Sequence, residues 1–370
     1  MNILYDYSIF SLQRYGGISR YFYELINRIS LNKEASVNVF EGFHINEYGL
    51  SGNKDNFCSY KGYKIPSIKY TNKIIRLNPI WFKRAYSHMD NLDIFHPTYY
   101  REDMDKFRKS PIVITVFDMI HELYNDQFKD ATREIKSKKN SIMNADIIIC
   151  ISENTKKDLI NIYDIPEDTA KVVYLANSLK TVDDNKVHDV RTIYGIKNPF
   201  LLYVGQRGGY KNFSLLLNVY SNRFSKMFDL VCFGGNEFTR KELQTIKNFN
   251  LTGRVLRITG SDDLLALLYK NAFCFVYPSL YEGFGIPPLE AMALGCPVVA
   301  GKTSSIPEVV ENAGILFDPH SEESLTNAIE SLIKSESTRT KLIKRGLKHE
   351  KKFTWEKTAM ETYEIYKSLT

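Results

Sequence analysis

Residues Tyr277–Pro297, YPSLYEGFGIPPLEAMALGCP, decide the fold more than any other part of the chain. They follow the apolar run AFCFV, which predicts a buried strand, and they begin with a glycine-bearing loop. Pro287 and Pro288 are typical of the first turn of a helix, because the backbone donors there have no partner within the helix. The stretch therefore indicates a strand, a loop and a helix, with the next strand following at Val298–Val299.

Two glutamates in this stretch, Glu282 and Glu290, have seven residues between them. The spacing alone says little, because 43 acidic residues in 370 give about five pairs at any one separation by chance. The context predicts Glu282 in the loop and Glu290 within the first turn of the helix, near its positive end. The loop amides around Phe284–Ile286 are expected to offer free N–H groups to a polyhydroxyl or phosphate group. The alternative is an ordinary acidic N-terminal turn.

The same alternation of strand and helix runs through most of the chain and predicts parallel sheets covered by helices. It stops at the polar segment Asn177–Lys197, which is interpreted as a linker, and then restarts. We therefore expect an α/β protein of two doubly wound domains that face each other across a cleft, with ligands beyond the carboxyl ends of the strands. The predicted strands are Asn2–Asp6, Ser36–Phe40, Asp93–Thr98, Ile112–Phe117, Asp146–Ile151, Val172–Leu175, Phe200–Val204, Leu230–Phe233, Val255–Ile258, Phe273–Val276 and Val298–Val299. The predicted helices are Ile18–Arg28, Phe128–Met143, Thr155–Ile162, a long charged one at Ser321–Lys351, and Thr354–Leu369.

Composition and charge exclude several classes of protein. Hydrophobic residues make up 44% and charged residues 25%, as in ordinary globular proteins and unlike disordered chains. The net charge of +6 gives no reason to expect a nucleic-acid binder. Five cysteines, four of them in apolar runs and none in a CxxC pair, indicate neither a disulfide framework nor a zinc site. No apolar stretch approaches the roughly 20 residues of a membrane span and no signal peptide is visible, so the cytoplasm is the expected compartment.

Residues 56–89 form a basic and aromatic segment without a single acidic residue. Lysine and arginine alternate there with tyrosine, tryptophan and phenylalanine. Two interpretations remain open: a solvated face of the protein, or a surface that docks on the anionic inner face of the cytoplasmic membrane.

Two further glycine loops follow predicted strands. Leu202–Phe213, LYVGQRGGYKNF, carries Arg207 and Lys211 and can bring two cations and several amides to a diphosphate, although a solvated turn is the alternative. In YGGISRY, Gly16 and Gly17 permit close approach of the backbone to a ligand just before a helix.

The stretch from Glu282 to Glu290, continued by CPVVAGKTSSIPEVVENAGILFDP at Cys296–Pro319, resembles the glutamate-x7-glutamate signature of the retaining glycosyltransferases of family 4. That family has the GT-B fold of two Rossmann-like domains. The resemblance is strong over Phe200–Pro319 and looser in the first domain. It implies an acceptor-binding domain at 1–180 and a nucleotide-sugar-binding domain at 190–353. It also implies that the final helix, 354–370, packs back on the first domain.

The resemblance also implies roles for individual residues in the second domain. Glu290 would hold the ribose hydroxyls of the donor, and Glu282 would contact its sugar or diphosphate side. The backbone amides near Phe284, Gly285 and Ile286 would bind sugar hydroxyls.

A basic pair would neutralise the leaving diphosphate. Lys211 matches the family lysine, whereas Arg207 lies one place later than the arginine of many members, where this chain has Gln206. The loop of Gly16 and Gly17 would face the donor phosphates across the cleft.

Three residues of the first domain follow predicted strands and are expected to point at the cleft. His96 and His121 are candidates for the acceptor side, although a single histidine is often structural. Many family members carry a histidine where this chain has Phe117, but the following Asp118 remains. Asp118 would orient the acceptor or the donor sugar and need not be a nucleophile, and His121 cannot be assumed to replace the missing histidine.

These observations predict a retaining hexosyltransferase that needs neither cofactor nor metal ion. Its donor would be a GDP- or UDP-sugar, with mannose preferred by resemblance. Its acceptor would be a lipid-linked or other oligosaccharide in bacterial O-antigen, capsule or lipopolysaccharide synthesis. A nucleotide-sugar hydrolase or epimerase of the same fold and a non-catalytic sugar-nucleotide-binding scaffold are the alternatives. We expect a cytoplasmic enzyme that can lie peripherally on the membrane, with no nucleic-acid partner.

Overall fold

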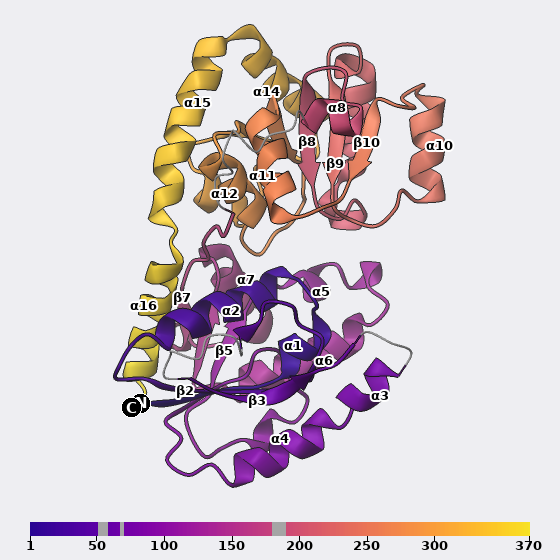
Figure 1. Ribbon diagram of the computed structural model, residues 1–370. Helices are drawn as coiled ribbons and strands as arrows, with labels where there is room; N and C mark the ends of the chain where they lie inside the picture. Colours follow the sequence, from indigo (N-terminus) through magenta and orange to yellow (C-terminus); the bar gives the residue numbers. More distant parts are fainter. Residues whose placement is uncertain (51–57, 67–69, 180–189) are drawn as a thin grey trace. The chain divides into compact units, whose positions relative to one another are not determined.

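The computed structural model describes residues 1–50, 58–66, 70–179 and 190–370, which form two compact units. Unit 1 comprises Met1–Leu175 together with Thr354–Thr370, and unit 2 comprises Ala176–Phe353. Each unit is built from parallel strands with helices packed against them (Figure 1). Over the described ranges, none of the helices has the length and apolar character needed to span a membrane.

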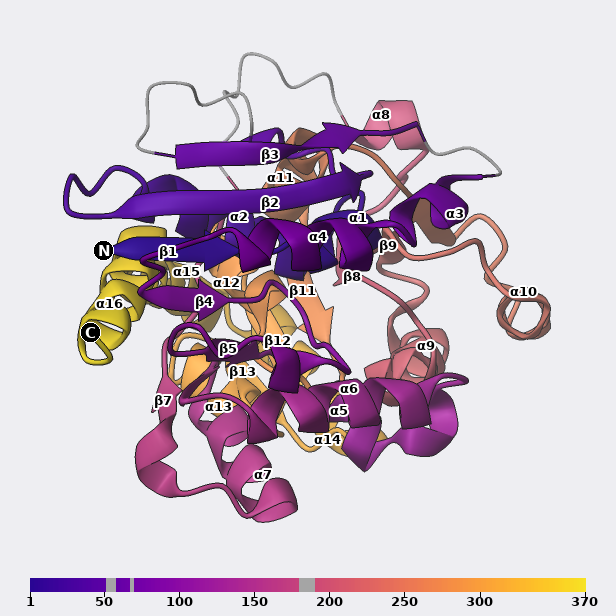
Figure 2. The ribbon, with the colours of Figure 1, turned by 90° about the horizontal axis from the view of Figure 1, so that it is seen from below.

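In unit 1 the strands lie in the order β3-β2-β1-β4, and a backbone bridge from Phe95 to Ile112 continues this layer into β5-β6-β7 (Figure 2). The order reverses between β1 and β4, so the loops that follow these two strands meet at the carboxyl edge. The strands are β1 (Asn2–Tyr5), β2 (Ser36–His44), β3 (Cys58–Lys64), β4 (Ile94–His96), β5 (Val113–Val116), β6 (Ile147–Cys150) and β7 (Ala170–Val172).

Helices cover both faces of this sheet because successive residues of a buried parallel strand point to opposite sides. Phe40 of β2 packs on Phe82 of α4, whereas Tyr5 of β1 packs on Phe22 of α2. The helices of unit 1 are α1 (Ser8–Leu12), α2 (Gly17–Ile29), α3 (Thr71–Ile75), α4 (Asn78–Ser87), α5 (Ile120–Leu123), α6 (Ala131–Met143), α7 (Glu153–Tyr163) and α16 (Trp355–Lys367).

The last helix, α16, packs beside α2 and completes the core of unit 1 (Figure 1). Tyr366 is fully buried, and its hydroxyl lies 2.9 Å from the hydroxyl of Tyr5 and 2.6 Å from Nδ1 of His96. The remaining ring nitrogen of His96 lies 2.9 Å from the hydroxyl of Thr115. Buried polar groups are stable only when they are hydrogen-bonded, so these contacts specify where α16 docks.

Unit 2 contains a six-stranded parallel sheet in the order β10-β9-β8-β11-β12-β13. Here the order reverses between β8 and β11. The strands are β8 (Phe200–Val204), β9 (Asp229–Phe233), β10 (Val255–Ile258), β11 (Cys274–Tyr277), β12 (Val298–Gly301) and β13 (Ile315–Phe317). The helices are α8 (Val190–Tyr194), α9 (Phe213–Val219), α10 (Arg240–Asn248), α11 (Asp262–Asn271), α12 (Ile286–Ala293), α13 (Ile306–Val310), α14 (Glu322–Lys334) and α15 (Glu336–His349).

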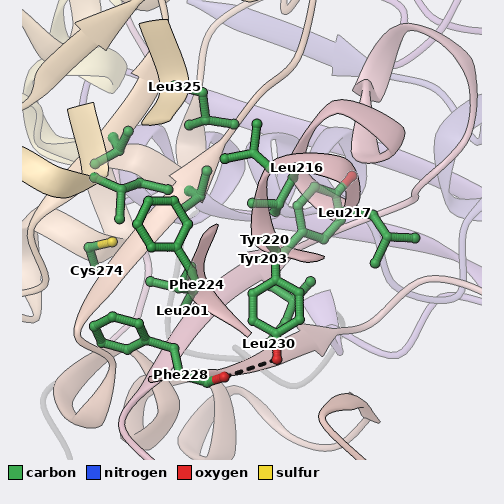
Figure 3. Packing of buried hydrophobic residues seen from close by; sticks show 14 of the residues in the cluster. Leu201, Tyr203, Leu216, Leu217, Tyr220, Phe224, Phe228, Leu230, Cys274 and Leu325 are labelled. Atoms are coloured by element: carbon green, nitrogen blue, oxygen red, sulfur yellow. Dashed lines mark hydrogen bonds between the residues drawn. The ribbon is translucent and has the colours of Figure 1, made fainter. Parts of the chain in front are cut away.

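One face of this sheet and the helices α9 and α14 enclose a continuous apolar core (Figure 3). Leu201 of β8, Leu216 of α9 and Leu325 of α14 are fully buried in it. The hydroxyl of Tyr220 donates 2.9 Å to the carbonyl of Phe228, so the only polar atom of this buried ring has a partner. This core fixes the sheet that carries the loops described below.

The structure corrects several predicted boundaries. Strands β3 and β13 were not predicted, and β7 begins two residues before the predicted Val172–Leu175. The helix predicted at Ser321–Lys351 is two helices, because the hydroxyl of Ser335 caps α15 by accepting from the Thr338 amide at 3.1 Å.

Two other predicted segments lie only partly within the described residues. Within the predicted linker, residues 190–194 form α8 and residues 180–189 lie outside the described part of the chain. The basic and aromatic segment contains β3, α3 and α4. Its residues 56, 57 and 67–69 lie outside the described part of the chain. Four of the five cysteines, those predicted in apolar runs, are buried and free.

Candidate active site

The reversal of strand order in unit 2 brings two predicted loops together. The loop after β8 and the loop after β11 leave neighbouring strands at the same edge of the sheet. The amide of Leu280 donates 2.7 Å to the carbonyl of Tyr210, and the side-chain amide of Asn212 donates 3.1 Å to the carbonyl of Pro278. These bonds join the loop that carries Lys211 to the loop that carries Glu282. Ligands of doubly wound sheets bind at this place.

Lys211 and Glu282 form an ion pair at this point. The Lys211 ammonium lies 2.7 and 2.9 Å from the two carboxylate oxygens of Glu282, and the side chains are 18% and 11% exposed. The ammonium also lies 5.8 Å from the centre of the Tyr277 ring. Glu282 is therefore buried and Lys211 is the more accessible partner, so an anionic ligand can reach the lysine while the glutamate remains its neighbour.

The backbone around Glu282 is fixed by two serines that were not among the predicted site residues. The hydroxyl of Ser304 accepts from the amide of Glu282 at 2.8 Å. The buried hydroxyl of Ser305 lies 2.8 and 2.6 Å from the carbonyls of Glu282 and Phe284. Gly285 follows with φ at 126°, a value that L side chains rarely adopt, and it is the N-cap residue of α12. The loop of predicted amides is therefore held in one conformation.

Glu290 is the fifth residue of α12, which corrects its predicted place in the first turn. The helix begins at Ile286, one residue before the two prolines, and this moves Glu290 to the start of the second turn. Its side chain is buried, and the hydroxyl of Tyr269 donates to the carboxylate at 3.2 Å. Burial, followed by the negative charge of Glu290, raises the pKa of Tyr269 well above its usual value, so this hydroxyl remains a donor.

The structure gives Arg207 partners within the protein. Its Nε lies 2.9 Å from the carboxylate of Glu242, another guanidinium nitrogen donates to the carbonyl of Asn236, and the guanidinium stacks on Phe238 at 4.5 Å. Arg207 is 7% exposed and lines a hollow of about 630 Å³ with Gly208 and neighbouring residues. It joins the loops after β8 and β9, and its positive charge is paired with the carboxylate of Glu242.

In unit 1, Gly16 precedes the first turn of α2 and Gly17 begins it. A Cβ on Gly16 would lie 2.2 Å from the side chain of Gln13, whose carbonyl oxygen accepts from the amide of Ser19 at 3.1 Å. A side chain at position 16 would push away the end of the Gln13 side chain and its bond to Ser19, whereas a Cβ on Gly17 would meet open space.

His96 lies inside unit 1 and does not reach its surface, which corrects the prediction that it points at a ligand. It is fully buried between Tyr366 and Thr115, and burial lowers its pKa to about 3. His96 is therefore a neutral structural side chain. His121, on α5, packs its ring 4.5 Å from that of Phe128 and is half-buried.

Asp118 follows β5 and keeps part of its carboxylate accessible. One carboxylate oxygen accepts from the amide of Ile120 at 3.0 Å, and the side chain is 32% exposed. The structure also places beneath it a buried lysine, Lys138, that was not among the predicted site residues. Of the predicted residues, Lys211 and Glu282 meet at the switch point of unit 2, and Asp118 and His121 follow β5 of unit 1.

Residues 189–349 match the family model described as glycosyl transferases group 1. These residues make up most of unit 2 and are similar to the group 1 glycosyltransferases. They contain Lys211, Glu282 and Glu290, the three residues that the loops of unit 2 and helix α12 hold in place.

Outside the matched residues too, the chain is similar to proteins that cover nearly its whole length. It is 28% identical over 95% of its residues to a protein of Escherichia coli named O-antigen chain mannosyltransferase B, of which the alignment covers 96%. Sucrose-phosphate synthase of Thermosynechococcus elongatus has a similar structure, with a TM-score of 0.75, 19% identity and coverage of 100% and 98% of the two chains. Anabaena HepE in complex with UDP-glucose gives a TM-score of 0.75, 18% identity and full coverage of both chains. These likenesses show the GT-B fold and confirm the predicted fold class.

Proposed function

We propose that the protein transfers a hexosyl group from a nucleotide sugar to a hydroxyl group of a lipid-linked or other oligosaccharide, with retention of configuration, in the synthesis of a bacterial O-antigen or a related surface polysaccharide. The observation that carries the proposal is the Lys211–Glu282 pair at the switch point, followed along the chain by the buried Glu290 of α12, in residues that match the group 1 glycosyltransferases. The name of the Escherichia coli relative supports mannose as the sugar to test first. The UDP-glucose bound to Anabaena HepE supports a nucleotide sugar as donor.

In this proposal the residues of unit 2 bind the donor. The carboxylate of Glu290 accepts hydrogen bonds from ribose hydroxyls, and the Tyr269 hydroxyl holds that carboxylate in place. Lys211 contacts the diphosphate. The bond from the anomeric carbon to the diphosphate breaks, and an acceptor oxygen bonds to that carbon on the same face. The proton of the acceptor hydroxyl passes to the departing phosphate oxygen.

Charge develops on the diphosphate as it leaves, so preorganised donors lower the barrier. Lys211 supplies a full positive charge, and the amide of Ile286 at the start of α12 supplies an N–H group that has no partner within the helix, because Pro287 and Pro288 carry no N–H. Glu282 keeps the ammonium at the correct point before the donor arrives. The proposal uses no metal ion, so transfer is expected to persist in EDTA, and a loss restored by magnesium would refute that part of it.

The donor is tested first by thermal unfolding of the full chain with UDP, GDP, ADP and CDP at equal concentrations. A nucleotide at 100 times its Kd adds about 2.7 kcal/mol to the free energy of unfolding. The sugars of the protecting nucleotide are then offered together with a lipid-linked oligosaccharide, and NMR identifies the product. An α-linked product from an α-configured donor supports the proposal. Free sugar or an epimer indicates the hydrolase or epimerase, and nucleotide binding without turnover indicates the scaffold.

We also propose that unit 1 docks on an anionic membrane through α3, α4 and β3, which we call the basic surface. Its exposed basic residues are Lys61, Lys64, Lys73, Arg76, Lys83 and Arg84, and its exposed apolar residues are Tyr63, Tyr70, Leu77 and Ile80. On α4 the side chains of Ile80, Lys83 and Arg84 lie three and four positions apart and share one face, while Phe82 faces the core. Exposed apolar groups surrounded by cations fit the headgroup region of a bilayer.

Vesicle sedimentation tests this surface. The protein should bind vesicles that contain phosphatidylglycerol and should not bind vesicles of phosphatidylcholine alone, and added salt should weaken binding. At roughly 1 kcal/mol per basic residue, Lys83→Glu with Arg84→Glu should weaken binding at least tenfold. Lys241→Glu on α10 of unit 2 is the matched control. Equal binding by both variants would refute the basic surface as the contact.

A further inference from the structure

A buried lysine lies directly beneath the accessible aspartate of unit 1. The side chain of Lys138, on α6, is 1% exposed. Its ammonium donates 2.9 Å to the backbone carbonyl of Asp118 and 2.8 Å to the carboxylate of Glu122. It also lies 3.8 Å from the carboxylate of Asp118 and 5.5 Å from the centre of the Tyr100 ring. One cation therefore contacts the loop after β5 at two points.

The partners of Lys138 are themselves fixed. Glu122 is 6% exposed, and its second carboxylate oxygen accepts from the hydroxyl of Tyr163 at 2.8 Å. Glu122 belongs to α5, Lys138 to α6 and Tyr163 to α7, so three helices meet at this ion pair. Burial, followed by the hydrogen bond and charge of Glu122, raises the pKa of Tyr163, which keeps the hydroxyl protonated as the donor.

Asp118 differs from Lys138 and Glu122 because its side chain is 32% exposed. It sits at the carboxyl end of β5, the edge at which doubly wound sheets bind ligands. A buried ammonium is costly unless it is paired, and well-packed apolar residues often replace a buried ion pair without loss of stability. Stability alone therefore gives little reason for a charged side chain at position 138.

We propose that Lys138 is a positioning residue that holds Asp118 at the edge of the sheet, so that its carboxylate can accept hydrogen bonds from the acceptor sugar. The hydrogen bond to its carbonyl fixes the backbone of Asp118, and the ammonium 3.8 Å away attracts its carboxylate. Glu122 and Tyr163 hold the ammonium, and the ammonium holds the aspartate. The proposal rests on the proposed function in one respect, which is that the ligand at Asp118 is the acceptor.

The test separates charge at position 138 from stability. Lys138→Met leaves Glu122 buried without a cation and should lower the free energy of unfolding. Adding Glu122→Gln removes the second charge, so Lys138→Met with Glu122→Gln should regain much of that stability. If Lys138 positions Asp118, this double variant still transfers sugar at least tenfold less efficiently at limiting acceptor, while its KM for the donor is unchanged. Lys139→Met, the exposed neighbour on α6, is the matched control.

Hydrogen exchange supplies a measurement that does not depend on activity. The amide of Ile120 is held by Asp118, so peptides covering residues 117–123 should exchange faster in the double variant than in the wild type and the Lys139→Met control. Wild-type exchange, or full transfer by the stable double variant, would overturn the proposal. If the wild-type protein transfers no sugar at all, the proposed function fails, and the exchange measurement still decides whether Lys138 positions Asp118.

Discussion

In both units the strand order reverses at one point of the sheet, and an ion pair lies in the loops there. The two ion pairs differ in how much of their side chains is exposed. In unit 1, Asp6 follows β1 and lies 2.8 Å from Arg101, and their side chains are 0% and 5% exposed. The amide of Thr98, which follows β4, donates to the same aspartate at 2.8 Å. In unit 2, the corresponding loops carry Lys211 and Glu282, whose side chains are 18% and 11% exposed. An ion pair at a switch point can thus either tie the loops of the unit together or remain accessible to a ligand.

The largest expected effect concerns the buried pair. Arg101→Met leaves Asp6 charged and without its cation in the interior, which should lower the free energy of unfolding by about 3–5 kcal/mol. Urea unfolding measures this loss, and nucleotide protection of unit 2 should persist in the folded fraction. Asp6→Asn added to Arg101→Met should restore part of the stability. Wild-type stability with abolished transfer would instead place Arg101 in the reaction.

Substitution of Lys211, in the more accessible ion pair, should reduce activity more than stability. Lys211→Ala removes the cation that faces the leaving diphosphate and should lower kcat by roughly 10²–10³-fold, as removal of a single preorganised donor does in other enzymes. The loss of stability should be smaller than in Arg101→Met, because Lys211 and Glu282 are 18% and 11% exposed whereas Arg101 and Asp6 are 5% and 0% exposed. Steady-state kinetics and thermal unfolding of the same preparation check this. A Lys211→Ala protein with full activity would remove Lys211 from the site.

The buried interior of unit 1 should also respond to pH. The unfolded chain binds a proton on His96 below about pH 6.5, whereas burial keeps the folded histidine neutral until about pH 3. Stability therefore falls as the pH falls from about 6.5 towards 3, by up to about 1.4 kcal/mol per pH unit from this group. In His96→Gln this contribution is absent, so urea unfolding between pH 7.5 and 5.5 should show a shallower pH dependence than the wild type.

Two other buried groups of β2 titrate in this range and remain in both proteins. Burial lowers the pKa of His44 to about 4 and raises that of Glu41 to about 7. His44 acts in the same direction as His96, whereas Glu41 stabilises the folded protein most at low pH and loses that contribution between about pH 4.5 and 7. The difference between the wild type and His96→Gln isolates His96, and identical slopes would show that it is not buried and neutral.

The smallest expected effect concerns the hydrogen bond from Tyr269 to Glu290, the residue proposed to bind the ribose in unit 2. Tyr269→Phe removes the hydroxyl that donates to Glu290 and should weaken nucleotide binding by about 1 kcal/mol, or roughly fivefold. Titration calorimetry with the protecting nucleotide measures it. Phe275→Leu, at a neighbouring ring, serves as a packing control that leaves the carboxylate bonded. A change in kcat without a change in nucleotide affinity would contradict the assignment of Glu290 to the ribose.

The sequence predicted unit 2 better than unit 1 because the chemistry of unit 2 lies in local patterns. Strand, glycine loop and proline-initiated helix follow one another in Tyr277–Pro297, so Glu282 was expected in its loop before any tertiary contact was known. The partners of Arg207 could not be predicted, because Glu242 is 35 residues away along the chain and belongs to helix α10. The edge strand β3 was missed because Cys58–Lys64 lacks an apolar run.

In unit 1 the decisive contacts are separated along the chain. His96 follows a strand, as predicted, but only Tyr366, 270 residues later, shows that its ring nitrogens are already bonded. Lys138 belongs to a charged stretch of α6 that resembles any solvated helix in sequence, and its burial depends on the packing of α5 and α7. Periodicity can place such residues on elements, but it cannot show which of them become enclosed.

The docking of α16 on unit 1 affects how the protein folds during its synthesis on the ribosome. Tyr5 leaves the exit tunnel long before Tyr366, and their hydroxyls meet in one core. All of unit 2 is synthesised between them. Unit 2 can therefore complete its own core while unit 1 is still waiting for its last helix. A nascent or prematurely terminated chain exposes the ring of His96 and the apolar face of α2 until that helix arrives.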